Sequence, residues 1–272
     1  MIDLHCHTTA SDGIHPPAEV VRRAAAAGVK ILAISDHDTV EGVAEAAAEA
    51  MLRGIRIIPA VEISARFGED EVHLLGHFVD PDHLALREGL ASFRGGRLRR
   101  AERMVEKLRQ AGVDLHMDEL LAEVGASGGA VGRPHFARLL IAKGHAADFQ
   151  EAFDRWLGKG KIGFVERELP TAKEALRLIR RAGGASSLAH PALSGVDGAG
   201  MMELAAQGLE AIEVGHPGQG SETRRRLRAI ADSLGLLTTA GSDFHGDSGA
   251  LGAETMDSAA FLAYEALAKA VD

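Results

Sequence analysis

The sequence of 272 residues is poor in cysteine and in large aromatic residues. Its single cysteine, Cys6, excludes an internal disulfide and fits a reducing compartment. We expect Cys6 to be a small buried apolar residue and not a metal ligand or a redox group. One tryptophan and one tyrosine are too few for an extended stacking platform, which disfavours long single-stranded nucleic acids as ligands.

Membrane segments and excess positive charge are missing as well. No uninterrupted apolar run approaches the ~18 residues of a membrane-spanning helix, and the strand-like start at residues 1–4 lacks the regions of a signal peptide. We therefore expect a cytoplasmic protein with no membrane partner. The formal net charge of −9 argues against broad binding to nucleic acid, so we expect no stable DNA complex. The sequence leaves the oligomeric state open.

Strand and helix signals alternate in the first and last thirds of the chain. Short apolar runs, many of them β-branched, predict strands, which we place at residues 1–4, 29–34, 55–61, 72–78, 185–189, 209–214 and 236–240. Helical patterns separate most of them, at residues 17–27, 40–53, 171–182 and 222–234. Such alternation predicts an α/β fold, specifically a parallel βα barrel.

The strand signals stop between about residues 94 and 170. Apolar residues at helical spacing predict short helices there, at 97–109, 119–124, 135–143 and 148–157. We interpret this block as a helical, cap-like insertion. The predicted organisation is a first barrel part (1–95), the insertion (96–170) and a second barrel part (171–272).

Side chains that bind metals follow the predicted strands. His5 and His7 are two residues apart on an extended segment, so both imidazoles project to the same side. The wider set comprises His5, His7, Asp12, the run Asp36-His37-Asp38, Glu62, His73, His190, Asp243 and His245. A structural zinc site would draw thiolates from short loops. Dispersed histidines and carboxylates near strand ends, where such barrels carry active sites, predict a catalytic metal cluster.

These motifs resemble the PHP (polymerase and histidinol phosphatase) family of metal-dependent phosphoesterases. The resemblance covers the chain nearly end to end and rests on Asp3-Leu4-His5-Cys6-His7, Ser11-Asp12-Gly13, Ser35-Asp36-His37-Asp38, Val61-Glu62-Ile63-Ser64, Val72-His73, Ala189-His190-Pro191 and Gly241-Ser242-Asp243-Phe244-His245. It implies a distorted parallel (β/α)7-type barrel with a helical insertion. The insertion motif Gly132-Arg133-Pro134-His135 and the later Glu213-Val-Gly-His216-Pro217 resemble a stand-alone group of nucleoside 3′,5′-bisphosphate phosphatases and 5′→3′ exonucleases on short RNA.

The resemblance also implies three metal sites. Carried over residue by residue, the ligand sets are His5, His7, Glu62 and Asp243 for the first ion, Glu62, His73 and His190 for the second, and Asp12, His37 and His245 for the third. Imidazole and carboxylate ligands without thiolate suit manganese, iron or zinc better than magnesium or calcium. We expect two or three divalent transition-metal ions, with manganese first.

Substrate contacts are expected beside this cluster. A metal-bound hydroxide would attack phosphorus, so no serine or cysteine nucleophile is needed. Arg133 is a candidate phosphate clamp because a guanidinium binds two oxygens at once. His216 and His135 are candidates to donate a hydrogen bond to phosphate or to protonate the leaving oxygen. Five other histidines match no family motif, namely His15, His77, His83, His116 and His145.

The leading expectation is hydrolysis of a phosphomonoester on a small nucleotide such as a nucleoside 3′,5′-bisphosphate. The nearest alternative is 5′→3′ exonuclease activity on short RNA oligonucleotides, which would use the same metals. Related chains often have an aromatic residue near Leu169, where a base could stack, and this chain has none there. Histidinol-phosphate phosphatase, a non-catalytic polymerase-associated PHP module and an amidohydrolase-type C–N hydrolase are further alternatives.

Overall fold

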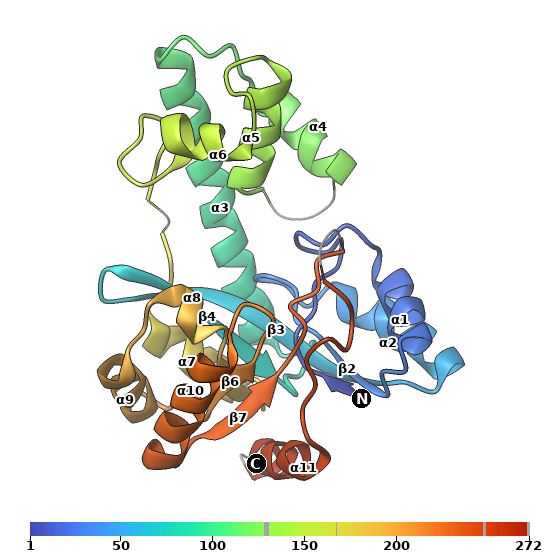
Figure 1. The fold of residues 1–272 in the computed structure, drawn as a ribbon. Helices are drawn as coiled ribbons and strands as arrows, with labels where there is room; N and C mark the ends of the chain where they lie inside the picture. Colours follow the sequence, from blue (N-terminus) through green and yellow to red (C-terminus); the bar gives the residue numbers. More distant parts are fainter. Residues whose placement is uncertain (128–130, 167, 247–248, 271–272) are drawn as a thin grey trace. The chain divides into compact units, whose positions relative to one another are not determined.

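The computed structural model describes residues 1–127, 131–166, 168–246 and 249–270. The chain divides into two compact units (Figure 1), the first comprising Met1–Ala91 with Pro170–Asp272 and the second Ser92–Leu169. The borders expected from sequence, 95/96 and 170/171, lie near the ends of this second unit. No helix among the described residues is both long and apolar enough to cross a bilayer.

The first unit contains one seven-stranded sheet, whose strands follow one another in chain order. The strands are β1 (Ile2–Asp3), β2 (Ile31–Ile34), β3 (Arg56–Phe67), β4 (Asp70–His77), β5 (Ala185–Leu188), β6 (Ala211–Gly215) and β7 (Leu237–Ala240). The segments that follow β1 and β7 then pair with each other. His7 N donates to Phe244 O at 2.9 Å and Asp243 N donates to His5 O at 2.8 Å, so the sheet nearly closes into a barrel.

The α/β barrel confirms the predicted fold class, but its sheet is mixed, which corrects the expectation of parallel strands at β4. β4 runs antiparallel to both β3 and β5, whereas the other neighbouring strands are parallel. The reason is the length of β3, which runs six residues past the predicted end and turns directly into β4. Gly68 makes this turn with a φ of +59°, a conformation that favours glycine. A short turn reverses the chain direction, and no crossover helix can form.

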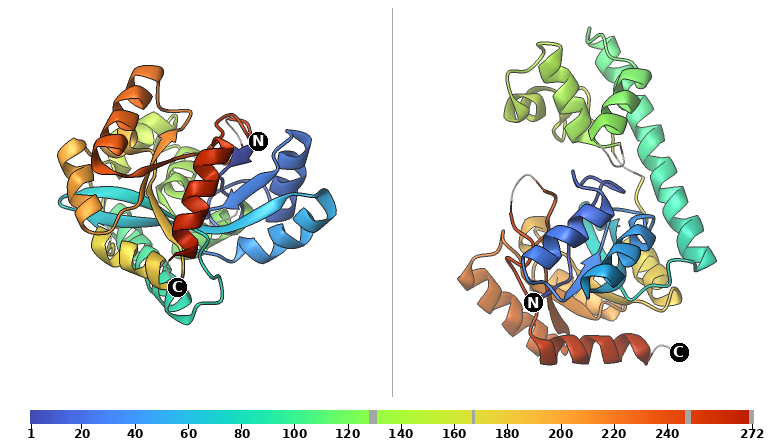
Figure 2. Two further views of the ribbon diagram at one scale, coloured as in Figure 1. Left: turned by 90° about the horizontal axis from the view of Figure 1, so that it is seen from below. Right: turned by 90° about the vertical axis from the view of Figure 1, so that its right-hand side faces the viewer.

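Helices surround this sheet (Figures 1 and 2). They are α1 (Pro17–Ala26), α2 (Gly42–Arg53), α7 (Ala172–Arg181), α8 (Pro191–Ser194), α9 (Gly198–Ala206), α10 (Ser221–Leu234) and α11 (Ser258–Lys269). The amphipathic pattern predicted α1, α2, α7 and α10, whereas α8, α9 and α11 were missed. α8 is only four residues long, and Asp257, whose carboxylate accepts from Ala259 N and Ala260 N, is the capping signal that could have revealed α11.

α11 lies across one end of the barrel (Figure 2, left). Its Phe261 and Tyr264 are buried with Leu4 and with a set of small side chains from the strands, namely Ala33, Ala60, Ala185, Ala211 and Ala240. These alanines leave room for the large ring of Tyr264, which is fully buried. This end of the barrel is therefore packed core, and the opposite end carries the polar residues.

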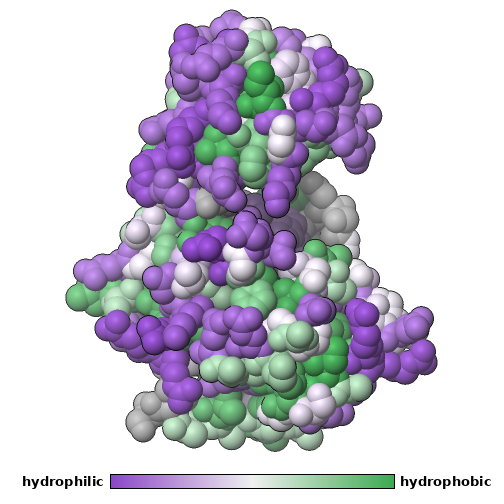
Figure 3. Space-filling model, turned by 90° about the vertical axis from the view of Figure 1, so that its left-hand side faces the viewer, coloured by the Kyte–Doolittle hydropathy of each residue, from purple (hydrophilic) through white to green (hydrophobic). Residues whose placement is uncertain are grey.

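The second unit contains no strand among its described residues. Its helices are α3 (Leu84–Gln110, which begins in the first unit), α4 (Met117–Ser127), α5 (Arg133–Ala142) and α6 (Phe149–Ala152), followed by a π-helical turn, η1 (Phe153–Leu157). α3 starts 13 residues before the predicted helix because Gly89, Gly95 and Gly96 obscure its pattern. A core that includes Met104, Leu108 and Phe136 holds these helices together. Hydrophilic side chains cover most of this unit on the face shown in Figure 3.

Candidate metal centre

The predicted ligands converge at the end of the barrel opposite α11. Segments directly after β1, β2, β5 and β7 carry seven of them, which are His5, His7, Asp12, His37, His190, Asp243 and His245. The other two, Glu62 and His73, lie within strands because β3 and β4 form a hairpin. Ser64 pairs directly with His73, and Glu62 is two residues from Ser64. Glu62 and His73 therefore project from the same face of the sheet.

All nine predicted ligands fall into four overlapping groups, within each of which the ligand atoms lie within 4.8 Å of one another. The groups are His7, Asp12, His37 and His245; His5, His7 and Asp243; His5, Glu62 and His190; and His37, Glu62 and His73. These groupings overlap the three inferred sets but differ in detail. His7 belongs to the Asp12 group as well as to the group with His5 and Asp243, and His37 also belongs to the group with Glu62 and His73.

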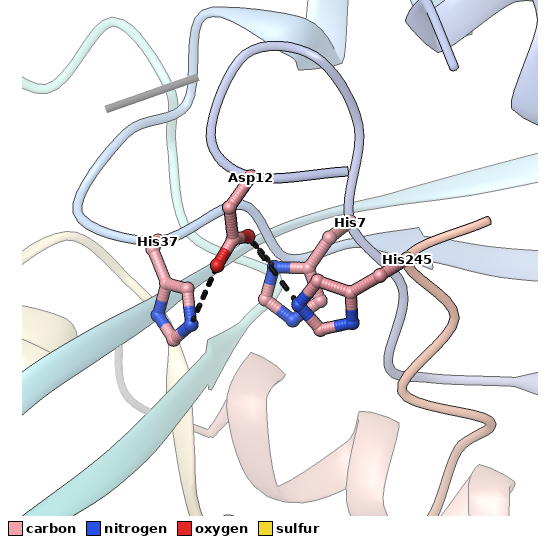
Figure 4. Close-up of side chains that lie close together, drawn as sticks. All are labelled: His7, Asp12, His37 and His245. Carbon is pink, nitrogen blue, oxygen red and sulfur yellow. Dashed lines mark ion pairs between the residues drawn. The ribbon is translucent and has the colours of Figure 1, made fainter. Parts of the chain in front are cut away.

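Asp12 is at the centre of the first group (Figure 4), between His37 and the stacked rings of His7 and His245. Its carboxylate lies 3.3 Å from His245 Nε2, 3.5 Å from His7 Nδ1 and 3.7 Å from His37 Nε2. Burial alone would raise the pKa of Asp12, but the neighbouring histidines, His37 first, lower it well below its usual range. Asp12 is therefore an ionised carboxylate among neutral or cationic imidazoles.

Glu62 contacts five imidazoles and is 1% exposed. Its Oε2 lies 3.1 Å from His7 Nε2, 3.2 Å from His37 Nδ1 and 3.4 Å from His5 Nε2, and its Oε1 lies 3.0 Å from His73 Nδ1 and 3.1 Å from His190 Nε2. Burial raises the pKa of Glu62, but these histidines outweigh burial and lower it well below its ordinary value. A carboxylate in this position can use its two oxygens for two different cations.

The hydrogen bonds of His5 and His7 leave two nitrogen lone pairs facing each other. His5 Nδ1 donates to Glu213 Oε1 at 2.9 Å, and His7 Nδ1 lies 3.4 Å from Ser11 Oγ. The two Nε2 atoms are 3.1 Å apart, and each lies 3.2 Å from Asp243 Oδ1. Acceptors that meet without a donor between them require a proton or a metal cation. This donor set fits a divalent transition metal.

When no ion is bound, protons on the histidines offset the negative charge of Asp12, Glu62 and Asp243. Burial lowers the pKa of His7, but Asp243, Glu62 and Asp12 outweigh it and raise that pKa to about 10. The pKa of His73 rises to about 9, because Glu62 outweighs burial there too. Burial dominates at His37, whose pKa falls to about 3. A bound cation would displace the protons from His7 and His73.

Asp36 supports the loop that carries Asp12. It accepts hydrogen bonds from Thr8 N at 2.7 Å, Thr8 Oγ1 at 2.8 Å and Ser11 Oγ at 2.6 Å, and it is buried. Gly13 closes this loop, since a Cβ there would lie 2.7 Å from the His7 carbonyl. Asp36 therefore positions a proposed ligand without belonging to any of the four groups.

Backbone conformation is unusual at several of these positions. Asp38, His190 and Asp243 have φ values of +54°, +30° and +49°, in the left-handed region that non-glycine residues rarely adopt. Gly241 is required by close packing, because a Cβ there would lie 2.3 Å from His5 Cβ. The chain thus maintains strained geometry where the proposed ligands meet.

His216 follows β6 and contacts a proposed ligand. Its Nδ1 accepts from Gly218 N at 2.9 Å, so its Nε2 carries the proton that it donates to Asp243 Oδ2 at 3.1 Å. This contact places His216 beside the cluster and orients Asp243. Sequence reasoning treated His216 as a possible acid or phosphate donor and did not foresee the bond to Asp243.

Arg133 and His135 lie in the second unit, at the start of α5. The Arg133 guanidinium stacks 5.5 Å from the centre of the Phe153 ring, and it lines a small recess together with Arg97 and Arg100. His135 is 3% exposed, and its Nδ1 accepts from Gly132 N at 3.1 Å, which caps α5. The five histidines without a family motif lie outside the four ligand groups of the described residues.

Comparison with known proteins gives the same family. The PHP domain family matches residues 3–165. A 5′-3′ exoribonuclease from Haemophilus influenzae is 37% identical over 247 residues, which are 89% of this chain and 89% of the relative. A 3′,5′-nucleoside bisphosphate phosphatase from Chromobacterium violaceum is 37% identical over 249 residues, which are 90% of this chain and 87% of the relative.

Solved structures agree at the level of the whole fold. A candidate metal-dependent phosphoesterase from Bifidobacterium adolescentis superposes with a TM-score of 0.87 at 32% identity, covering 97% of this chain and 95% of that one. An amidohydrolase from Chromobacterium violaceum, with bound sulfate and no metal, superposes with a TM-score of 0.86 at 34% identity, covering 97% and 96%. The chain therefore belongs to the PHP family and is a metal-dependent phosphoester hydrolase.

Proposed function

We propose that the chain hydrolyses a phosphomonoester of a small nucleotide, with a nucleoside 3′,5′-bisphosphate as the leading substrate. The observation that carries this proposal is the cluster of nine imidazole and carboxylate side chains around Glu62. The bisphosphate phosphatase from Chromobacterium violaceum supports the substrate class, since it is 37% identical over 90% of this chain. Sulfate, which resembles phosphate in shape and charge, is bound in the related Chromobacterium structure.

The proposed cofactor is a set of two or three divalent transition-metal ions, with manganese first and iron or zinc as alternatives. The proposed ligands are His5, His7, Asp12, His37, Glu62, His73, His190, Asp243 and His245. The geometry supports two separate ion positions, because the Asp12 group and the His5–Glu62–His190 group share no residue. Glu62, which contacts five imidazoles, is the proposed bridge between neighbouring ions.

Charge complementarity favours a phosphate substrate. Three divalent ions would contribute about +6 against about −3 from Asp12, Glu62 and Asp243, which leaves a cationic site in a chain of net negative charge. When bound, the ions would lower the pKa of a water molecule and neutralise charge that develops on phosphorus oxygens. The three carboxylates would hold the ions, and their lowered pKa values keep them ionised at neutral pH.

The proposed substrate residues are Arg133, His135 and His216. His216 holds Asp243 by the hydrogen bond described above, and its place beside the cluster supports a contact with the leaving oxygen. Arg133 offers two parallel N–H groups that match two phosphate oxygens. His135 lies two residues from Arg133 on the first turn of α5. These three roles rest on the family motif, and the Arg133 substitutions in the Discussion test the first of them.

Hydrolysis of short RNA from its 5′ end is the second candidate. The exoribonuclease from Haemophilus influenzae, 37% identical over 89% of this chain, favours it. The positions of the single tyrosine and the single tryptophan favour a nucleoside bisphosphate over RNA. Tyr264 is fully buried beneath the barrel, and the Trp156 indole packs against Arg155 and His145. Neither ring is an open platform on which successive bases could stack.

A manganese-supplemented kinetic comparison tests this proposal. The substrates are a nucleoside 3′,5′-bisphosphate, a nucleoside monophosphate, histidinol phosphate and 5′-phosphorylated RNA oligonucleotides of two to five residues. We expect the highest kcat/KM and release of inorganic phosphate with the bisphosphate. Faster release of mononucleotides from the oligonucleotides would favour the exonuclease. The Glu62→Gln variant, purified in parallel, shows whether any activity belongs to this site or to a contaminant.

A further inference from the structure

Glu213 is a buried carboxylate that the family motif leaves without a role. It lies in β6, is fully buried, and points across the barrel towards the segment after β1. Its single ion-pair partner among the described residues is His5. A buried carboxylate without a lysine or arginine partner is costly to keep, so its hydrogen bonds should explain its presence.

The two oxygens of Glu213 accept from two different proposed ligands. Oε1 accepts from His5 Nδ1 at 2.9 Å, and Oε2 accepts from the backbone N–H of His190 at 2.8 Å. Both residues belong to the His5–Glu62–His190 group. One side chain therefore contacts two of the three members of a single ligand group.

The contact with His5 fixes the form of its ring. An ionised carboxylate can only accept, so His5 Nδ1 must carry a hydrogen and its Nε2 must present a lone pair. That Nε2 atom lies 3.1 Å from His7 Nε2 and 3.4 Å from Glu62 Oε2, inside the cluster. A carboxylate behind a ligating histidine also raises the basicity of the ring.

The contact with His190 stabilises an unfavourable backbone. His190 has φ 30° and ψ 55°, a left-handed conformation at a non-glycine residue. This conformation directs its Nε2 towards Glu62 Oε1, 3.1 Å away. Gln219 connects the same segments, because its Nε2 donates to Glu213 O at 3.0 Å while its Oε1 accepts from Ala192 N at 3.2 Å.

We propose that Glu213 is a positioning residue. It determines the tautomer of His5 and stabilises the backbone conformation of His190, and thereby orients two ligands of one proposed metal site. The inference rests on the proposed metal centre but not on the choice of substrate. Glutamine is the informative replacement, because it has one oxygen and one NH2 group where glutamate has two acceptors. In one orientation of the glutamine amide, its NH2 group faces the His190 N–H, so two donors meet and the hydrogen bond to His190 is lost. In the other orientation, the NH2 group donates to His5 Nδ1. The hydrogen of the His5 ring must then move to Nε2, and Nε2 can no longer bind a metal.

The test is zinc binding and histidine NMR on the full chain. We expect Glu213→Gln to bind its weakest Zn²⁺ at least 10-fold less tightly in a chelator competition, the usual scale for a carboxylate behind a metal ligand. The matched control is Glu210→Gln. Glu210 immediately precedes β6, and its Oε2 likewise accepts two hydrogen bonds, from Ser186 N at 2.7 Å and Ser186 Oγ at 3.1 Å, without contact to a proposed ligand. The Glu210→Gln protein should bind zinc as tightly as the wild type does.

NMR of the zinc-loaded wild type tests the inference without any variant. Long-range ¹H–¹⁵N spectra should show His5 protonated at Nδ1 and ligating through Nε2. Ligation through Nδ1, or unchanged zinc affinity in a folded Glu213→Gln protein, would overturn the inference. A wild type that binds zinc but hydrolyses none of the tested esters would refute the proposed function alone, since neither readout depends on activity.

Discussion

Glu62 and His73 meet across the β3–β4 hairpin, with Glu62 Oε1 3.0 Å from His73 Nδ1. The contact exists because the two strands are antiparallel, with Ser64 opposite His73 and Glu62 on the same face. A parallel arrangement would have separated these residues by a crossover connection. The hairpin thus brings two proposed ligands to the site from within strands.

The first prediction concerns Glu62→Gln, which removes the charge of the central carboxylate with almost no change in shape. Folding should persist, and the two proposed sites that share Glu62 should both weaken. We expect activity to fall at least about 10²-fold, in line with the several kcal/mol that metal polarisation supplies. Kinetics and elemental analysis of the same preparation measure this. Near-normal turnover with full metal content would show that Glu62 is not a bridge.

Arg133→Ala separates phosphate recognition from metal binding. Metal content should stay unchanged, and phosphate anchoring should weaken by about 1.5–3 kcal/mol, the scale of a charge-assisted hydrogen bond. If Arg133 holds the phosphate that is not cleaved, kcat/KM for a bisphosphate should fall far more than for a monophosphate. If it holds the reacting phosphate, both should fall alike.

Two further variants control this experiment. Arg155→Ala removes another arginine that stacks on an aromatic ring of the same unit, 5.7 Å from Trp156, and should leave kcat/KM unchanged. Arg133→Lys should restore only part of the loss, because an ammonium cannot make a two-pronged contact. Wild-type kinetics on both substrates in Arg133→Ala would remove Arg133 from the site.

The third prediction is a pH dependence of stability in the ion-free protein. His7 and His73 have pKa values raised from 6.5 to about 10 and about 9. Their stabilisation is fully present below about pH 6.5 and is lost as pH rises through those values. The Tm of ion-free protein should therefore fall between about pH 7 and pH 10, and bound metal should reduce this dependence. A Tm of the ion-free protein that stays constant over that range would contradict the prediction.

Gly241→Ala tests the close approach of the segment after β7 to His5. The new Cβ would lie 2.3 Å from His5 Cβ, so the backbone must move. We expect a loss of about 1–3 kcal/mol of stability, as for overpacked cores, together with weaker metal binding. Gly220→Ala is the control, because nothing lies within 4 Å of its Cβ position and its φ of −67° suits alanine. Equal effects of the two substitutions in denaturant unfolding would refute this account of Gly241.

Sequence reasoning was most successful where local pattern determines structure. Short apolar runs predicted all seven strands, and the motifs named nine ligand-type residues that the structure brings together at one end of the barrel. Their binding of metal stays a prediction. The predicted direction of β4 was wrong because it depends on the turn at Gly68. The packing of Tyr264 into the end of the barrel was missed because no residue near it in the sequence indicates its partners. Asp36 and Glu213 were missed as supporting residues for a similar reason, since their partners lie up to 208 residues away.

The most direct test of the central claim is a manganese titration of chelator-treated protein, in which bound metal and hydrolysis of a nucleoside 3′,5′-bisphosphate are measured on the same samples. The claim is that the nine side chains hold ions that the reaction requires. We predict negligible phosphate release without metal, and a rise that accompanies binding of two or three equivalents and then reaches a plateau. Full activity in protein that elemental analysis shows to be free of metal would contradict the account.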